Sequence, residues 1–531
     1  MRPAFLALLL VAAPAIAAEV APDPATGPVQ PGVAVVEVPG LGPAAIQLIA
    51  ADPRWIQDQL AVIAGAAGAD PGPVAALVAR ALLRLGSLDH IDPGRPLGVW
   101  LREGPTDLAM LVPIQRRTRI IDEIGMAADG RAPLVRTGDR DGTVVLTQST
   151  PDGLVEYRAL VTEGWLALAR TADECRRLIG RASSLTPEGA PLRVTLDPRR
   201  LSGGWSRLGL AVEPRWIPAR FRLPALPSPL DALPDPGPAA WAALAAQFAA
   251  IDIEVAPWGG PGDPEAQGRW RVAVRLRPLP EAPHATWLTN QRLAADRLGP
   301  ALDTDDAWFL ASFYPIWQGQ AERLVAGPLA QAAAIAGAAW DGRATDAAGV
   351  LAAGADRSGG IGMTDGPQGG LLLIEHGSPA DMAVALADIL TPVLGAGQNT
   401  AVAGATGLVH PGTPNRLTVA TDAAVLHAWA DDTATLPVLA GRGAAASAVP
   451  APIGQPAVLG RIRLRFDRLL RPVAALQRGA SIEMPTAEIV ADLTIRDGDL
   501  VITADLPATA IASAIGALEL GPRPRPAGGP R

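Results

Sequence analysis

The sequence predicts an α+β fold of two tandemly duplicated lobes, each a mostly antiparallel sheet packed with helices. The main observation is an internal repeat. Residues 158–180 read RALVTEGWLALARTADECRRLIG, and residues 416–441, RLTVATDAAVLHAWADDTATLPVLAG, are a looser copy. The elements around the two copies recur in the same order, as expected for a duplicated module. The length agrees, because 531 residues exceed the size at which a single hydrophobic core stops growing.

The first copy is predicted to form a β-hairpin followed by a helix. Two short apolar runs, 158–161 and 165–169, flank Gly164, and glycine supplies the positive φ that a tight turn needs. Thr171 and Glu174 then have the spacing of a helix capping box. The apolar residues that follow recur at helical spacing, which predicts a helix with one buried face.

The second copy has weaker helix signals. Pro437 restricts where its helix can begin and leaves Asp431 and Thr433 as alternative starts. A better-capped helix is expected over 378–393, which begins with a serine, a proline and an acidic residue and then has one apolar face. Further helices are expected from Asp52, from Asp70, and over 116–124, 286–298 and 316–340.

A predicted hairpin closes each lobe. Residues 251–256 and 269–277 alternate in polarity, and their counterparts, 487–495 and 500–505, flank a tight turn at Asp497-Gly498. The predicted organisation is a signal peptide at 1–17, a Pro-rich lead at 18–44, a first lobe at 45–280 with a Pro-rich insertion at 213–238, a second lobe at 281–520, and a disordered tail at 521–531.

The N-terminus has the pattern of a secretory signal peptide, with Arg2, an apolar run over 5–11 and a small-x-small cleavage site at 15–17. The apolar run is too short for a transmembrane anchor, and no cysteine follows the cleavage site to carry a lipid. We therefore expect a periplasmic or extracellular protein. The formal net charge is −8, and without a basic excess we expect no nucleic-acid partner.

The order of a strand, the run GWLALA, a second strand and an acidic helix resembles that of secreted bacterial proteins built from repeated α+β modules, whose function is uncharacterised. The resemblance extends over the mature chain as a general pattern. It implies an envelope or extracellular setting and brings no functional residues with it.

Residues that could carry catalysis do not form a recognisable motif. No serine lies in a G-x-S-x-G turn, and the glycine clusters lack the pattern of a nucleotide site. Cys175, the single cysteine, falls on an apolar helix face and is expected to be a packed thiol. We expect no cofactor and no metal site, because no metal-binding spacing includes any of the five histidines, His90, His284, His376, His410 and His427.

Tryptophans crowd the region around the Pro-rich insertion, and indoles with arginines can stack on sugars, apolar ligands or partner proteins. The alternative explanation for these tryptophans is core packing and loop anchoring. The candidate binding residues are Trp216, Arg220, Phe221, Arg222 and Trp258.

The leading hypothesis is a secreted or periplasmic, non-catalytic binding or scaffold protein. Its partner would be an envelope protein or an apolar or sugar ligand. Two alternatives stand beside it: an envelope hydrolase with a dispersed carboxylate site, whose residues could converge from distant positions, and a purely structural envelope component. The absence of a catalytic motif favours the non-catalytic hypotheses over the enzyme.

Overall fold

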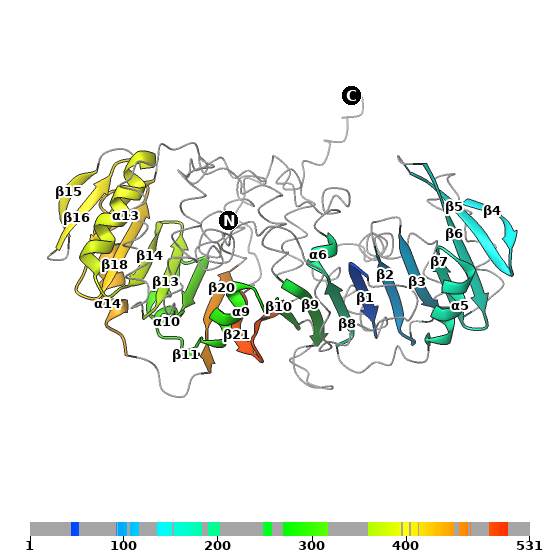
Figure 1. Cartoon of the computed structure of the whole chain (residues 1–531). Coiled ribbons are helices and arrows are strands. Elements are labelled where there is room, and N and C mark those ends of the chain that lie inside the picture. The colour runs from blue at the N-terminus through cyan, green and yellow to red at the C-terminus, as the bar shows by residue number, and fades with distance from the viewer. Residues whose placement is uncertain are drawn as a thin grey trace, which may run out of the picture.

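The structure is a computed structural model, and it describes residues 44–51, 92, 94–102, 107–115, 135–150, 153–182, 190–201, 248–257, 269–316, 359–394, 397–402, 405–412, 414–450, 456–465, 468 and 488–507. The described residues form mostly one large antiparallel sheet, and 56% of them are strand and 18% helix (Figure 1). The expected α+β class, with helices packed on the sheets of two lobes, is therefore wrong. The helices expected from Asp52, from Asp70, over 116–124 and over nearly all of 316–340 lie outside the described residues.

Among the described residues, twenty strands form the main sheet. Those in the first half of the chain are β1 (Ile46–Ala50), β2 (Leu97–Leu101), β3 (Leu108–Pro113), β4 (Val135–Arg140), β5 (Thr143–Thr150), β6 (Gly153–Thr162), β7 (Trp165–Ala169), β8 (Leu192–Leu196), β9 (Phe248–Pro257) and β10 (Arg269–Pro278). Those in the second half are β12 (Phe309–Phe313), β13 (Ile361–Gly366), β14 (Gly369–Glu375), β15 (Gln398–Val402), β16 (Ala405–His410), β17 (Asn415–Ala420), β18 (Ala424–Ala430), β20 (Gly460–Arg465), β21 (Glu488–Arg496) and β22 (Asp499–Pro507). A separate small pair joins β11 (Ala294–Ala295) to β19 (Ala457–Val458).

Neighbouring strands of the main sheet pair antiparallel in the order β4-β5-β6-β7-β3-β2-β1-β8-β9-β10-β22-β21-β20-β12-β13-β14-β18-β17-β16-β15. Figure 1 shows them as one long row with β4 at one end and β15 at the other. The second half repeats the strand order of the first. The last strand of each half, β10 or β22, meets the other at the centre of the row.

The seam between the halves is the β10–β22 pair, which runs from Arg269 opposite Pro507 to Leu276 opposite Leu500. Because equivalent strands pair antiparallel there, the two halves are related by an approximate two-fold axis. Opposite charges face each other across this seam, with arginines on β10 and aspartates on β22. Arg275 and Arg277 both contact the buried Asp499.

Six helices accompany the described strands: α5 (Ala172–Gly180), α6 (Pro198–Leu201), α9 (Pro283–Thr289), α10 (Leu298–Leu302), α13 (Pro379–Leu394) and α14 (Leu436–Ser447). The single helix expected over 286–298 is two short helices with β11 between them. The chain leaves the first at Gln291, whose side-chain amide hydrogen-bonds both backbone groups of Ile316. Within the described part of the chain, no helix is both long and apolar enough to cross a bilayer.

The capping box expected at the start of α5 is confirmed. The backbone N–H of Glu174 donates to the Thr171 hydroxyl at 3.2 Å, and the Glu174 carboxylate accepts from the backbone N–H of Thr171 at 3.1 Å. The same carboxylate accepts from Arg102 after β2, at 2.5 Å. The cap therefore also fixes the helix against the sheet. By contrast, α14 begins at Leu436, later than either start expected from the sequence.

The hydrophobic clusters of the described residues each stay within one half of the chain. Two clusters draw on residues between 44 and 182, and three on residues between 287 and 502. In the second half, α10 and α14 pack on one face of the sheet, over Leu371, Leu417 and Leu426. On the opposite face, α13 packs against Val425. The strip beside α13 on this face holds the candidate site.

Candidate functional site

The binding residues predicted from the sequence, Trp216, Arg220, Phe221, Arg222 and Trp258, all lie outside the described residues. Their assignment stays a prediction. Within the described residues, the densest group of ionisable side chains with shifted pKa values lies on the second half of the sheet, on the face away from α14. Such groups mark candidate functional sites.

Five residues stand directly opposite one another on five adjacent strands, and we call them the Asp365 row. In order across β13, β14, β18, β17 and β16 they are Asp365, Gly370, Trp429, Arg416 and His410. Residues that are directly opposite in a sheet point to the same face, so four polar or aromatic side chains share one strip. Next to this row, His427 of β18 stands opposite Thr418 of β17.

Gly370 makes the first part of the row possible. A Cβ atom at this position would lie 2.2 Å from the Trp429 ring, so only glycine lets the indole lie across β14. From there the indole Nε1–H donates to Oδ1 of Asp365 at 3.2 Å. The backbone N–H of Gly366 donates to the same oxygen at 3.1 Å, and the Trp308 side chain also hydrogen-bonds this carboxylate.

Asp365 is 9% exposed, and burial raises its pKa to about 6, against the lowering effect of the hydrogen bonds from Trp429 and Trp308. Desolvation disfavours the charged form of an acid, whereas donated hydrogen bonds favour it. The burial effect is the larger one. This carboxyl group therefore changes its charge near pH 6 instead of near pH 4.

The proton on His427 can be placed by elimination. Nη1 of Arg416 lies 3.4 Å from Nε2 of the ring, and because a guanidinium can only donate, Nε2 is the acceptor. Nδ1 then carries the hydrogen and donates it to the Thr418 hydroxyl at 2.9 Å. Burial, with the positive charge of Arg416 and the neighbouring His410, lowers the pKa of His427 to about 3. The imidazole is neutral at physiological pH.

Arg416 is the least satisfied cation of the group. Its side chain is only partly exposed, and burial lowers its pKa to about 10 although Asp365 acts in the opposite direction. Nε is buried and has no hydrogen-bond partner among the described residues. A buried donor without an acceptor costs about 1–3 kcal/mol. An anionic group that reached this guanidinium would remove that cost.

The arrangement suits recognition of an anion more than acid–base chemistry. Arg416 offers donors, the Trp429 indole offers an aromatic surface, and the neutral His427 fixes the position of Arg416. The hydrogen bonds of His427 go to a hydroxyl and a guanidinium, whereas those of Asp365 come from indoles and the backbone. The two groups therefore do not form a His–carboxylate pair with each other.

The first half of the chain has no equivalent of this row at the position where the sequence repeat would place it. The repeat aligns Arg158 with Arg416. However, Arg158 stands opposite Ala169, which packs beneath α5, whereas Arg416 stands opposite Trp429, on the face away from α14. The two arginines thus lie on opposite faces, and Arg158 pairs with Glu156 at 2.6 Å. The alignment of the two copies is out of register by an odd number of residues.

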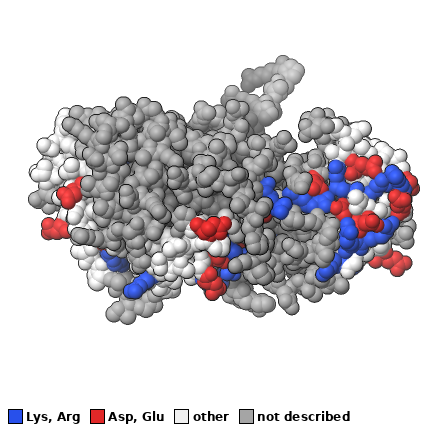
Figure 2. Space-filling model, viewed as in Figure 1, with Lys and Arg blue, Asp and Glu red and all other residues white. Residues whose placement is uncertain are grey.

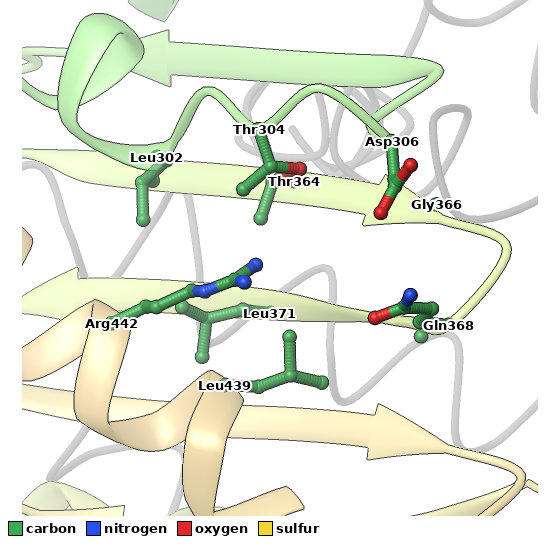
Figure 3. Close-up of a pocket in the computed structure, with 10 residues that line it drawn as sticks. Leu302, Thr304, Asp306, Thr364, Gly366, Gln368, Leu371, Leu439 and Arg442 are labelled. Carbon is green, nitrogen blue, oxygen red and sulfur yellow. The ribbon is translucent and has the colours of Figure 1, made fainter. Parts of the chain in front are cut away.

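Two other candidates have structural explanations. Cys175 is fully buried, burial raises its pKa to about 12, and its thiol donates to the backbone oxygen of Arg158, so it is a packed thiol. A small hollow where α10, α14 and the β13–β14 turn meet is lined partly by Arg442, Gln368 and Asp306 (Figure 3). Its free volume of about 30 Å³ holds one or two water molecules.

Sequence reasoning missed the Asp365 row, although part of the signal was present. Arg416 and Thr418 alternate with apolar residues in one predicted strand, as His427 and Trp429 do in the next. In a hairpin these two pairs must face each other on one side of the sheet. The contribution of Asp365 could not be found in this way, because β13 reaches β18 only through β14.

No protein-family model matches this chain, and no curated protein matches it. Among solved structures, the "Structure of crystal form I of TP0453" aligns with 44% of this chain and 74% of its own chain, at 7% sequence identity and a TM-score of 0.21. A similarity this low supports no conclusion about fold or function.

Proposed function

We propose that this chain is a secreted or periplasmic, non-catalytic binding protein, and that its ligand presents a carboxylate or phosphate group to Arg416. One observation carries the proposal. The guanidinium of Arg416 is partly buried, its Nε has no acceptor among the described residues, and its described hydrogen bond goes to a histidine nitrogen. Arginine is well suited to bind either anion with two parallel hydrogen bonds.

Other partly buried arginines in the same half of the sheet support this interpretation by contrast. Arg461 contacts Asp492 at 2.6 Å, Arg463 contacts Asp303 at 2.5 Å, and Arg297 contacts Glu375. In this sheet a desolvated guanidinium is ordinarily matched by a carboxylate. Among the described residues, Asp365 acts on Arg416 through its charge but forms no ion pair with it, so we infer that a ligand supplies the anion.

The aromatic surroundings indicate the rest of the ligand. The Trp429 indole lies beside Arg416 on the same face and is partly exposed, and the His427 ring lies 6.2 Å from it between ring centroids. A flat apolar or sugar-like group attached to the anion could stack there. The setting outside the cytoplasm rests on the N-terminal signal pattern, and the predicted segment with Trp216 and Arg220 would be a second contact region.

The test is a titration of the mature full-length chain with benzoate and, separately, with inorganic phosphate, followed by tryptophan fluorescence and calorimetry. We expect saturable binding of at least one probe, weakened at least tenfold in Arg416→Gln. Arg442→Gln is the matched control, because Arg442 is an exposed arginine of α14, on the other face of the sheet. Equal responses in the two variants, or no binding of either probe, would contradict the proposal.

A further inference from the structure

The row of strands in the main sheet has an edge strand at each end, β4 and β15. Each pairs with one neighbour among the described strands, β4 with β5 and β15 with β16. Every residue of β4 is exposed, and so are Gln398, Asn399 and Ala401 of β15. An exposed edge presents unpaired backbone N–H and C=O groups and is a template for pairing with another strand.

The β4 edge has two structural features that disfavour such pairing, a bulge and a high density of charged side chains. The register of β4 against β5 shifts between Arg136 and Gly138, so the strand is bulged. Charged side chains are dense along it, with Arg136 paired to Asp139 at 2.9 Å and Arg140 near Asp141 at 3.7 Å. Bulges and charges are the usual means by which proteins protect sheet edges.

The β15 strand has neither a bulge nor charged side chains. Its sequence, QNTAV, contains no charged residue and no proline, and its register against β16 is uninterrupted from Gln398 to Val402. The space-filling view shows the same contrast, with basic and acidic groups gathered at the β4 end and few at the β15 end (Figure 2). The strands β4 and β15 hold equivalent positions in the strand order, but only β4 has features that disfavour pairing with another strand.

We propose that β15 pairs with β15 of a second copy of this chain, antiparallel and about a two-fold axis at Thr400. In this register Thr400 stands opposite Thr400 of the second copy, and Asn399 stands opposite Ala401 in both directions. No charges oppose each other, and a Thr–Thr pair is a favourable cross-strand pair. The sequence of this edge is therefore complementary to itself.

The fold already contains this type of pairing. At the seam, β10 and β22 are equivalent strands from the two halves and pair antiparallel about an approximate two-fold axis. The β15 pair would extend the row beyond its open end by the same geometry. A strand of five residues buries little area, so we expect a weak dimer with a dissociation constant in the micromolar range or above.

Charge placement tests the register. Asn399→Arg with Ala401→Arg puts like charges opposite each other twice across the axis, whereas Asn399→Arg with Ala401→Asp puts opposite charges there. By sedimentation equilibrium of the full chain, we expect wild type and the Arg/Asp variant to dimerise, and the Arg/Arg variant to bind itself at least tenfold more weakly. Thr137→Arg, on the β4 edge, should leave the association unchanged. A monomeric wild type, or equal association in both double variants, would overturn the proposal.

Disulfide trapping gives a second measurement that does not depend on disrupting the dimer. Thr400→Cys places two thiols opposite each other at the axis, within the spacing that a disulfide spans, whereas the thiols of Asn399→Cys would not face each other. The native Cys175 is fully buried and does not compete. Under mild oxidation we expect a covalent dimer for Thr400→Cys and little for Asn399→Cys. Equal yields, or none from Thr400→Cys, would show that β15 is vacant or accepts a different strand.

Discussion

Asp365 links stability to pH through a raised pKa. Its folded-state pKa of about 6 lies above the ordinary value of 3.8, so the folded protein holds the proton more tightly than the unfolded chain does. The stability that this group contributes is complete below about pH 4 and is lost as the pH rises through 6. Above pH 6 the buried carboxylate is therefore a net cost.

Asp365→Asn should remove that cost, because the amide keeps an acceptor oxygen for the Trp429 indole without a charge. We expect the variant to be more stable than wild type by about 1–2 kcal/mol at pH 7.5 and to differ little from it at pH 4. Urea unfolding at several pH values measures the difference. A constant difference between the two proteins over this pH range would show that Asp365 does not titrate as described.

His427 links folding stability to pH in the opposite direction from Asp365. Its folded-state pKa of about 3 lies below the ordinary 6.5, so its contribution to stability is present above pH 6.5 and is lost as the pH falls toward 3. His427→Gln should therefore flatten the loss of stability between pH 6.5 and 4, whatever it costs at pH 7. The slope of unfolding free energy against pH is the measurement. A slope as steep as that of wild type would mean that another group drives the acid unfolding.

At the scale of the single element, two glycines of α14 form a natural matched pair. A Cβ atom at Gly443 would lie 2.7 Å from Leu426 and 2.8 Å from Leu371, whereas nothing lies within 4 Å of one at Gly441. Alanine is the better helix former by about 1 kcal/mol. Gly441→Ala should therefore stabilise the protein by up to that amount.

Gly443→Ala should destabilise the protein, since the added methyl group overpacks the contact between α14 and the sheet by about 1–3 kcal/mol. Thermal unfolding of the two variants should thus shift in opposite directions from wild type. If both variants became more stable, α14 would have to sit further from the sheet than it does here.

Elements were predictable from the sequence where their signals are local. The capping box of α5, the span of α13 and the strand pairs that became β9–β10 and β21–β22 are set by neighbouring residues. The Asp497-Gly498 turn has φ angles of 54° and 82°, as a type I′ hairpin turn requires. The joining of the two halves into one main sheet depends on a pairing between strands more than 200 residues apart, β10–β22, which no local pattern encodes.

The difference between local and long-range signals also explains which part of the candidate site could be predicted from the sequence. The hairpin pattern of β17 and β18 already places Arg416 beside Trp429 and Thr418 beside His427. The fit of the indole over Gly370, and thus the link to Asp365, depends on β14 lying between β13 and β18. The expected α+β class was wrong for a different reason, because the local helix signals did not show that strand (56%) far exceeds helix (18%) in the described residues.

At the scale of the whole molecule, the two halves share backbone pairing but not hydrophobic clusters. Across the seam, Asp499 is 5% exposed and is neutralised by Arg275 and Arg277 of the other half. The clusters of the described residues lie within one half each. This predicts two units that fold separately and stabilise each other mainly through one strand pair and its charges.

A fragment of residues 283–520 should therefore unfold cooperatively without the first half, although with lower stability than the full chain.

The substitution Asp499→Asn tests whether the contacts across the seam, and not a general loss of stability, account for the difference between the fragment and the full chain. In the full chain the substitution breaks the contacts with both arginines and should cost about 1–3 kcal/mol. In the fragment, β22 is an open edge and Asp499 faces water, so the same substitution should change stability by less than about 0.5 kcal/mol. Urea unfolding of the four proteins gives both differences. A fragment without a cooperative transition, or equal costs in the two backgrounds, would mean that the halves form one folding unit.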